Sequence, residues 1–101
     1  MQVVYIPCKD KEEAKKISRH LLEKKLIGCA NIFDVDSIYW WGKEIKEDTE
    51  AVLIGKTRSD DCKKIEEEVK KIHSYSCPCV MGIKVDSINE AYRLWLEMEC
   101  H

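Results

Sequence analysis

The sequence predicts an α+β fold in which helices cover one face of an antiparallel sheet. Three observations lead to this prediction. The hydrophobic patterns follow the order strand, helix, strand, strand, helix, strand; the two central strands read as one long hairpin; and 101 residues fit a single domain, residues 1–101.

The first strand and helix are bounded by clear signals. Residues 2–7 form an apolar run that ends at Pro7, as in a buried strand. Asp10 then places a carboxylate beside the unpaired N–H groups of a first helical turn, which favours an N-cap. Gly28 marks the stop after that helix. Apolar residues recur between these signals at three- and four-residue spacing, at Ala14, Ile17, Leu21 and Leu22.

The central hairpin is predicted at residues 29–41 and 44–57, with Gly42 and Lys43 in the turn. Each arm is roughly twice the common strand length, so its outer half should overhang a small domain. Adjacent aromatics, Tyr39 to Trp41, end the first arm. Because a strand sends neighbouring side chains to opposite faces, at least one of these rings must be covered by something outside the core, most simply another subunit.

The second half repeats the strand and helix signals. Residues 59–61 are expected to open a helix, residues 73–79 to form a loop and residues 80–85 to form a strand. Ser87 and Glu90 match a capping box, so a final helix is expected to begin there. This order is that of a ferredoxin-like βαββαβ sandwich with an extra C-terminal helix.

Composition excludes several partners. A net charge of −2 leaves no broad basic field for nucleic acid. No apolar run approaches the roughly 20 residues that span a bilayer, and no secretion signal is recognisable, so we expect a cytoplasmic protein with no membrane partner. In that compartment the six cysteines are expected to be reduced.

The loop at residues 73–79 contains the best candidate metal ligands. His73, Cys77 and Cys79 offer an imidazole and two thiolates, which suit copper(I) or zinc. Alternatively, the two cysteines are apolar fillers and His73 interacts with a helix end. No nucleotide loop or nucleophile–base motif is present, so we predict that the protein is not an enzyme.

A second candidate site could take a small anion. Lys56 to Arg58 end a strand just before a helix N-terminus. Asp60 and Asp61 lie at the same helix end, however, and would satisfy it without a ligand.

Several motifs carry a family resemblance. The chain resembles the CutA family of divalent-cation tolerance proteins in Gly28–Ile32, Ser37–Trp41, Gly42–Ile45, Glu47–Asp48, Lys56–Thr57 and His73-x-Tyr75-x-x-Pro78. The resemblance implies a homotrimer linked to tolerance of copper or other heavy metals. It also implies similarity to PII signalling trimers, which place ligands in clefts between subunits.

The same resemblance places Tyr39, Trp40, Lys56, His73 and Tyr75 in or near the cleft between subunits. This chain departs from the family where Cys77 replaces an aliphatic residue and Cys79 replaces an acidic one. The departure either makes the cleft softer in ligand character, which favours copper(I) or mercury, or removes the usual hard-ligand role. We therefore expect a copper-tolerance trimer that binds a soft or borderline cation near this cleft, with no organic cofactor. The alternative is a PII-like signalling or scaffold trimer that binds a small anionic ligand at the interface.

Overall fold

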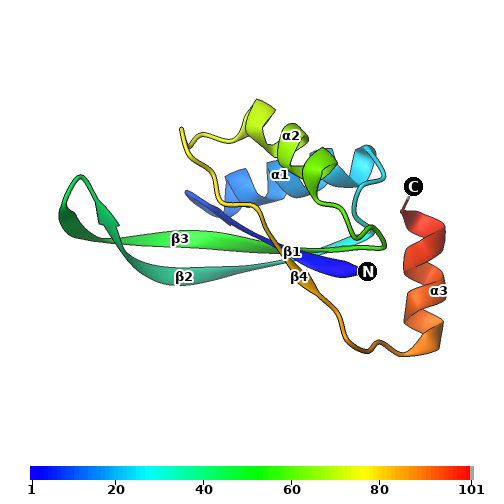
Figure 1. Ribbon diagram of the computed structural model, residues 1–101. Coiled ribbons are helices and arrows are strands. Elements are labelled where there is room, and N and C mark those ends of the chain that lie inside the picture. Colours follow the sequence, from blue (N-terminus) through cyan, green and yellow to red (C-terminus); the bar gives the residue numbers. More distant parts are fainter. Residues whose placement is uncertain (101) are drawn as a thin grey trace.

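The computed structural model describes residues 1–100, which form one four-stranded antiparallel sheet and three helices (Figure 1). The elements are β1 (Gln2–Cys8), α1 (Lys11–Glu23), β2 (Cys29–Trp41), β3 (Glu44–Thr57), α2 (Lys63–Ile72), β4 (Met81–Lys84) and α3 (Glu90–Glu99). The strand order is β2-β3-β1-β4. Helices α1 and α2 lie over one face of the sheet, and α3 stands at the end opposite the hairpin tip. The predicted α+β sandwich is confirmed.

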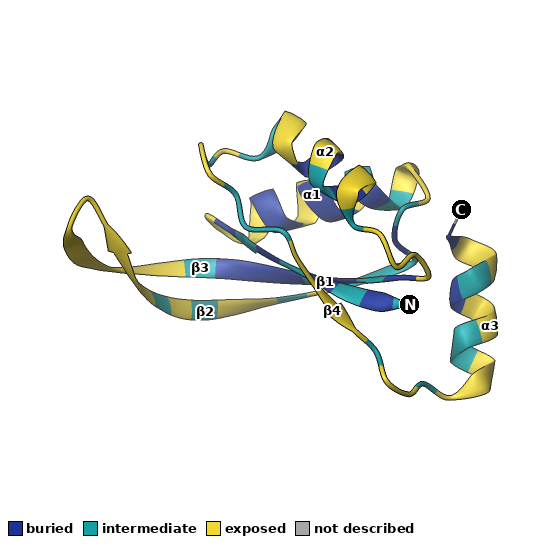
Figure 2. Cartoon of the chain, viewed as in Figure 1, coloured by how far each residue is buried: buried dark blue, intermediate teal, exposed yellow. Residues whose placement is uncertain are grey.

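The core lies between the sheet and helices α1 and α2. Alternate residues of β1 point toward the helices, so Val4, Ile6 and Cys8 are fully buried. Ile17 and Leu21 of α1 meet them from above. Figure 2 shows this burial as dark blue on the strands beneath the helices.

The helix starts agree only partly with prediction. The Asp10 carboxylate accepts a hydrogen bond from the Glu13 backbone N–H at 2.9 Å, which confirms this N-cap. Ser87 does not cap α3, because the helix begins at Glu90 and its N-cap residue Asn89 makes no side-chain cap bond. The tetrapeptide pattern alone thus misplaced this start, since residues 85–89 follow the end of β4 in an irregular path.

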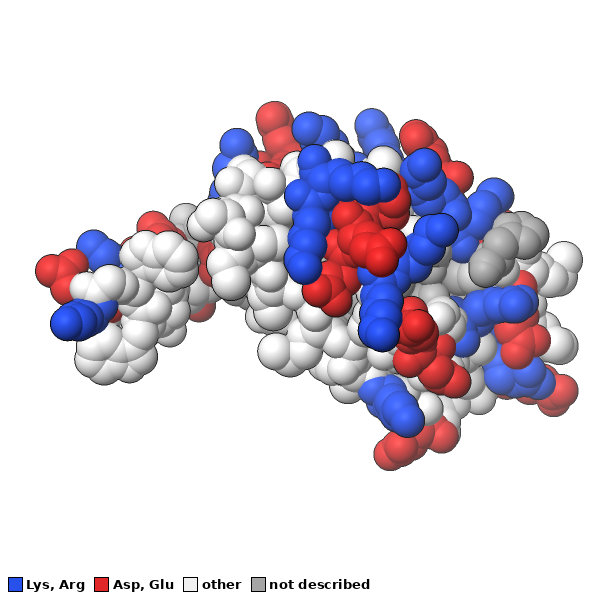
Figure 3. Space-filling view, turned by 45° about the horizontal axis from the view of Figure 1, so that its top comes forward, with Lys and Arg blue, Asp and Glu red and all other residues white. Residues whose placement is uncertain are grey.

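The hairpin projects far beyond the body of the domain. The two strands pair from Cys29 opposite Lys56 to Trp41 opposite Glu44. Gly42 and Lys43 both have positive φ, +58° and +67°, as a two-residue type I′ turn requires. The outer half leaves large apolar side chains in solvent; Ile38, Trp40, Trp41 and Ile45 are 59–71% exposed. Figure 3 shows this projection as a largely uncharged surface with charges at its tip, in contrast to the charged helical side.

The sheet face opposite α1 and α2 is also apolar and uncovered within one chain. Phe33 lies on this face, and so do Met81 and Ile83, which pair with Tyr5 and Val3 of β1. These three side chains are 41%, 54% and 49% exposed. An apolar surface of this extent is typical of a subunit interface. Among residues 1–100, no helix has both the length and the apolar character that crossing a membrane requires.

Candidate metal and ligand site

A cavity of about 380 Å³ lies where the hairpin leaves the body of the domain. The hairpin and the loop after α2 provide its chemically active side chains. They are Tyr39, Trp41, Asp48, Glu50, Tyr75, Cys77 and Cys79. The cavity therefore combines two thiols, two carboxylates and two phenols.

Strand alternation and hairpin register place these groups. Tyr39 and Trp41 are two residues apart on β2 and point to the same face. Asp48 and Glu50 of β3 pair with Ser37 and Val35, which lie on that face as well. The segment at residues 73–80 connects α2 to β4, and its Tyr75, Cys77 and Cys79 line the cavity together with the hairpin residues.

Each phenol is held by a carboxylate. The Tyr39 hydroxyl donates to Asp48 Oδ2, and the Tyr75 hydroxyl donates to Glu50 Oε2 at 2.7 Å. The bond to Asp48 is the main cause that raises the pKa of Tyr39. Burial, followed by the bond to Glu50, raises the pKa of Tyr75. Both phenols are therefore neutral donors at physiological pH, and both carboxylates are oriented by them.

The two thiols are free in this cavity. Cys77 is exposed and Cys79 is half-buried. Burial is the largest cause that raises the pKa of Cys79, followed by the nearby Cys77 and Glu50. A bound cation would reverse this effect, because a coordinating thiol loses its proton to the metal.

His73 faces inward instead. Its side chain is fully buried, its Nε2 lies 2.9 Å from the Pro7 carbonyl oxygen, and its Nδ1 accepts from the Tyr75 N–H at 3.1 Å. These partners assign the neutral tautomer with the proton on Nε2, because a carbonyl oxygen accepts and an N–H donates. Both ring nitrogens are thus engaged within the protein.

His73 forms a cluster with Cys8 and Glu13, whose ligand-type atoms and those of His73 all lie within 4.8 Å of one another. Glu13 accepts hydrogen bonds from the backbone N–H groups of Lys9 and Ser74, at 3.0 and 2.9 Å. Burial, together with nearby carboxylates, raises the pKa of Cys8 to about 12, so its thiol is neutral. This cluster ties the loop to β1 and α1 and leaves His73 no free nitrogen for a metal.

The structure therefore separates the predicted metal ligands. Cys77 and Cys79 share the cavity, whereas His73 lies in the inward-facing cluster behind it. The Pro7 carbonyl oxygen causes this separation, because it holds the His73 ring facing inward. Pro7 is 66 positions from His73 in the chain, so local sequence patterns could not predict this contact.

The predicted ligand-binding residues are also divided. Tyr39 and Tyr75 line the cavity, but Trp40 is on the opposite face of β2 and 71% exposed. Lys56 lies eight positions along β3 from Asp48, about 25 Å away at strand rise. Its ammonium is 5.1 Å from the centre of the Tyr92 ring, in a different cavity of about 310 Å³.

Sequence reasoning missed three members of the site, namely Trp41, Asp48 and Glu50. The signal was available, since a two-residue turn at Gly42 and Lys43 sets the hairpin register and strand alternation then groups these residues with Tyr39.

A model of the CutA1 divalent ion tolerance protein family matches residues 2–99. The chain belongs to this family. It is 41% identical to the divalent-cation tolerance protein CutA of Pyrococcus horikoshii, over 95% of this chain and 94% of that protein. It is 39% identical to the protein of the same description from Archaeoglobus fulgidus, over 93% and 92% of the two chains.

Solved structures agree with this CutA assignment. The crystal structure of CutA1 from Pyrococcus horikoshii has a TM-score of 0.94 to this chain at 39% identity, covering 100% of this chain and 99% of that one. The PII-like protein CutA from Nostoc sp. PCC 7120 has a TM-score of 0.89 at 25% identity and covers 100% and 98%. The CutA fold with PII-like relatives is therefore established for this chain.

Proposed function

We propose that this CutA protein is a homotrimer that acts in tolerance of copper or a similar soft or borderline cation, which it binds at the base of the hairpin. The observation that carries this proposal is the cavity where Cys77 and Cys79 face Asp48 and Glu50. Thiolates select copper(I) and other soft ions, and carboxylates neutralise the remaining charge. The role is binding rather than catalysis.

The uncovered surfaces support a trimer. The sheet face with Phe33 and Ile83 and the projecting hairpin with Trp40 are apolar and exposed in one chain. The outer half of β3 pairs only with β2, which leaves an unpaired strand edge beyond the end of β1. Association of subunits would cover both the apolar face and this edge.

A trimer would also bring together Lys56 and Tyr39, which lie far apart within one subunit. Lys56 is about 25 Å along β3 from Asp48, so one subunit cannot present it and Tyr39 to the same small ligand. In the proposed assembly the cavity of one subunit lies in a cleft next to its neighbour, which would contribute the missing side.

We place the protein in the cytoplasm, because free thiols such as Cys77 and Cys79 persist in a reducing compartment. In contrast, the solved structure from Archaeoglobus fulgidus is that of a periplasmic divalent cation tolerance protein CutA. Fractionation of source cells with an antibody against this chain would decide between the two compartments.

The first test is native mass spectrometry of the reduced protein during titration with copper(I), copper(II) and zinc. We expect a trimer that takes up one copper per subunit. Affinity should fall as the pH is lowered, since protons compete for the thiolates. A monomer, or a ragged series of weakly held ions, would contradict the proposal.

Changing Cys77 and Cys79 together to Ser should lower copper affinity at least about a hundredfold, because the loss of two thiolates removes the soft ligands. The matched control is Cys29→Ser with Cys62→Ser, two half-buried cysteines outside the cavity. Competition with a chromogenic copper(I) chelator provides the measurement. An unchanged affinity in the Cys77 and Cys79 variant would exclude this cavity as the copper site.

The alternative is a PII-like trimer that binds a small anion, which the Nostoc structure and the Lys56–Tyr92 cavity favour. The two cationic side chains expected to contact that anion, Lys56 and Arg58, lie in different cavities. Arg58 lines the cavity at the end of α1 and donates to the Glu97 carbonyl oxygen. A trimer that remains metal-free throughout the titration would favour this second function.

A further inference from the structure

A third cavity, of about 340 Å³, lies on the helix side of the sheet and contains neither Cys77 nor Cys79. The end of α1, the end of β3, the first turn of α2 and Cys100, which directly follows α3, all contribute to it. Its basic lining residues are Lys24, Lys25, Arg58 and Lys64. The buried Ile65, which is 1% exposed, also lines the cavity.

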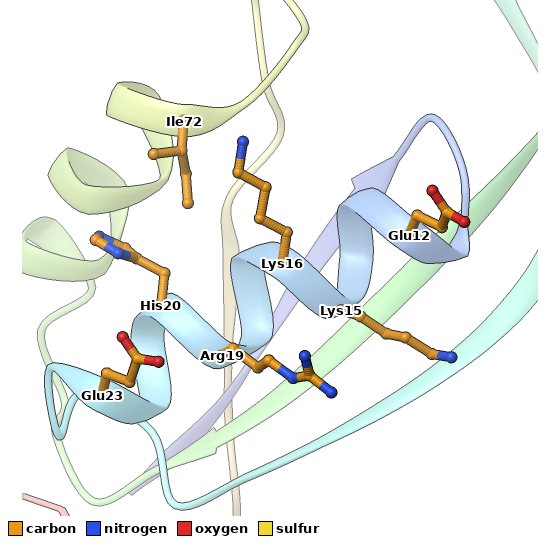
Figure 4. A pocket seen from close by; sticks show the side chains of 7 residues that line it. All are labelled: Glu12, Lys15, Lys16, Arg19, His20, Glu23 and Ile72. Atoms are coloured by element: carbon orange, nitrogen blue, oxygen red, sulfur yellow. The ribbon is translucent and has the colours of Figure 1, made fainter.

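The charge of this lining is unusual for the molecule. Four basic residues and one acidic residue, Asp61, leave a formal charge of 4 − 1 = +3, whereas the whole chain carries −2. The cavity on the outer side of α1 makes a useful comparison. There Lys15, Lys16 and Arg19 are flanked by Glu12 and Glu23, which leaves 3 − 2 = +1 with His20 neutral (Figure 4).

The cations of the third cavity also lack direct ion-pair partners. Within residues 1–100, none of the four belongs to an ion pair. The Arg58 guanidinium donates at 3.4 Å to the Glu97 carbonyl oxygen, which is a neutral acceptor. The Asp61 carboxylate already accepts from the Lys63 N–H at 2.9 Å. Cations gathered without partners repel one another, and a multivalent anion would relieve this repulsion.

We propose that this cavity binds a small multivalent phosphate anion of the pyrophosphate class. The Arg58 guanidinium offers paired N–H donors that match phosphate oxygens, and the lysines add mobile point charges. A volume of about 340 Å³ accommodates a small ligand. This site is separate from the thiol cavity and goes beyond the metal-binding function.

The test is isothermal titration of the metal-free protein with sodium pyrophosphate at low ionic strength. The site variant is Arg58→Gln with Lys64→Gln, and the matched control is Lys15→Gln with Arg19→Gln. Both remove two exposed positive charges, one Lys and one Arg, so both should fold. We expect affinity to fall at least about tenfold in the site variant, to change less than about twofold in the control, and to weaken with added NaCl.

Absence of pyrophosphate binding to the unaltered protein, or an equal loss in both variants, would overturn the proposal. A parallel titration with ADP distinguishes a nucleotide from free pyrophosphate as the ligand. Tighter binding of ADP would indicate that the site recognises a nucleotide. Equal binding would indicate that it recognises the diphosphate group alone. The variant with Cys77→Ser and Cys79→Ser should retain full pyrophosphate affinity. If this variant loses copper binding but keeps pyrophosphate binding, the phosphate site is independent of the metal site.

Discussion

Glu13 is the residue that connects the start of α1 to the loop of the candidate site. It is buried, and its two carboxylate oxygens accept hydrogen bonds from the N–H groups of Lys9 and Ser74. Burial by itself would raise the pKa of Glu13, but these hydrogen bonds outweigh burial and lower the pKa below its ordinary value. The folded protein therefore favours the ionised carboxylate.

Glu13→Gln should lower the free energy of unfolding by about 1.5–3 kcal/mol at pH 7, because charge-assisted hydrogen bonds are lost at a buried position. A lowered folded pKa means that the stabilisation is present in full above the ordinary pKa of 4.5 and disappears as the pH falls through the lower folded value. Urea unfolding of both proteins at pH 7, 5 and 3.5 measures this difference.

Glu12→Gln is the matched control for this experiment, since Glu12 is exposed on the same helical turn. Its effect should be below about 0.5 kcal/mol at each pH. A Glu13→Gln difference that stays constant down to pH 3.5 would show that the ionised carboxylate is not the source of the stabilisation.

At the scale of elements, α3 is attached to the domain through a close approach at Gly28. A Cβ atom at this position would lie 2.6 Å from Leu96 Cδ1 and 3.5 Å from Cys100 Sγ. Leu96 and Cys100 are the buried residues at this end of the chain. Glycine is therefore required here by packing, beyond its role as a helix stop.

Gly28→Ala should destabilise the protein by about 1–3 kcal/mol, because the added methyl forces α3 away from the sheet. Leu96→Val removes the δ carbons that the methyl would meet. The double variant should therefore be more stable than the sum of the two single effects predicts, as measured by urea unfolding. Strict additivity would argue against the Leu96 contact as the cause.

At the scale of the whole molecule, the exposed apolar surfaces are best explained by assembly. The single chain measures 45 × 26 × 21 Å along its principal axes, with the hairpin extending its long dimension. A ring such as Trp40, 71% exposed at the end of this projection, is far from any core that one chain provides.

Trp40→Ala should weaken the proposed trimer by about 3–5 kcal/mol, the usual effect of deleting a buried aromatic ring. Sedimentation velocity over a dilution series measures the association. Met98→Ala is the control, because Met98 is similarly exposed, at 77%, but lies on α3 away from the hairpin. Equal dissociation constants for the two variants would show that the Trp40 ring is not at the interface.

Much of the fold was predictable because its signals are local. Asp10 caps α1 as its position before an apolar stripe indicates, and the turn at Gly42 and Lys43 sets the whole hairpin register. The start of α3 was predicted wrongly at Ser87, because a capping-box pattern is short and tertiary packing of Leu96 and Cys100 positions that helix instead.

The sequence by itself determined the order of the elements, the faces of the hairpin strands and the family, because periodicity, turn chemistry and motifs are properties of neighbouring residues. Only the tertiary structure decided which reactive side chains share a space. It directs His73 to Glu13 and Cys8, and it brings Cys77 and Cys79 to the carboxylates of β3. The path of the loop at residues 73–80 causes this division, since contacts with distant backbone groups such as the Pro7 carbonyl hold that loop in place.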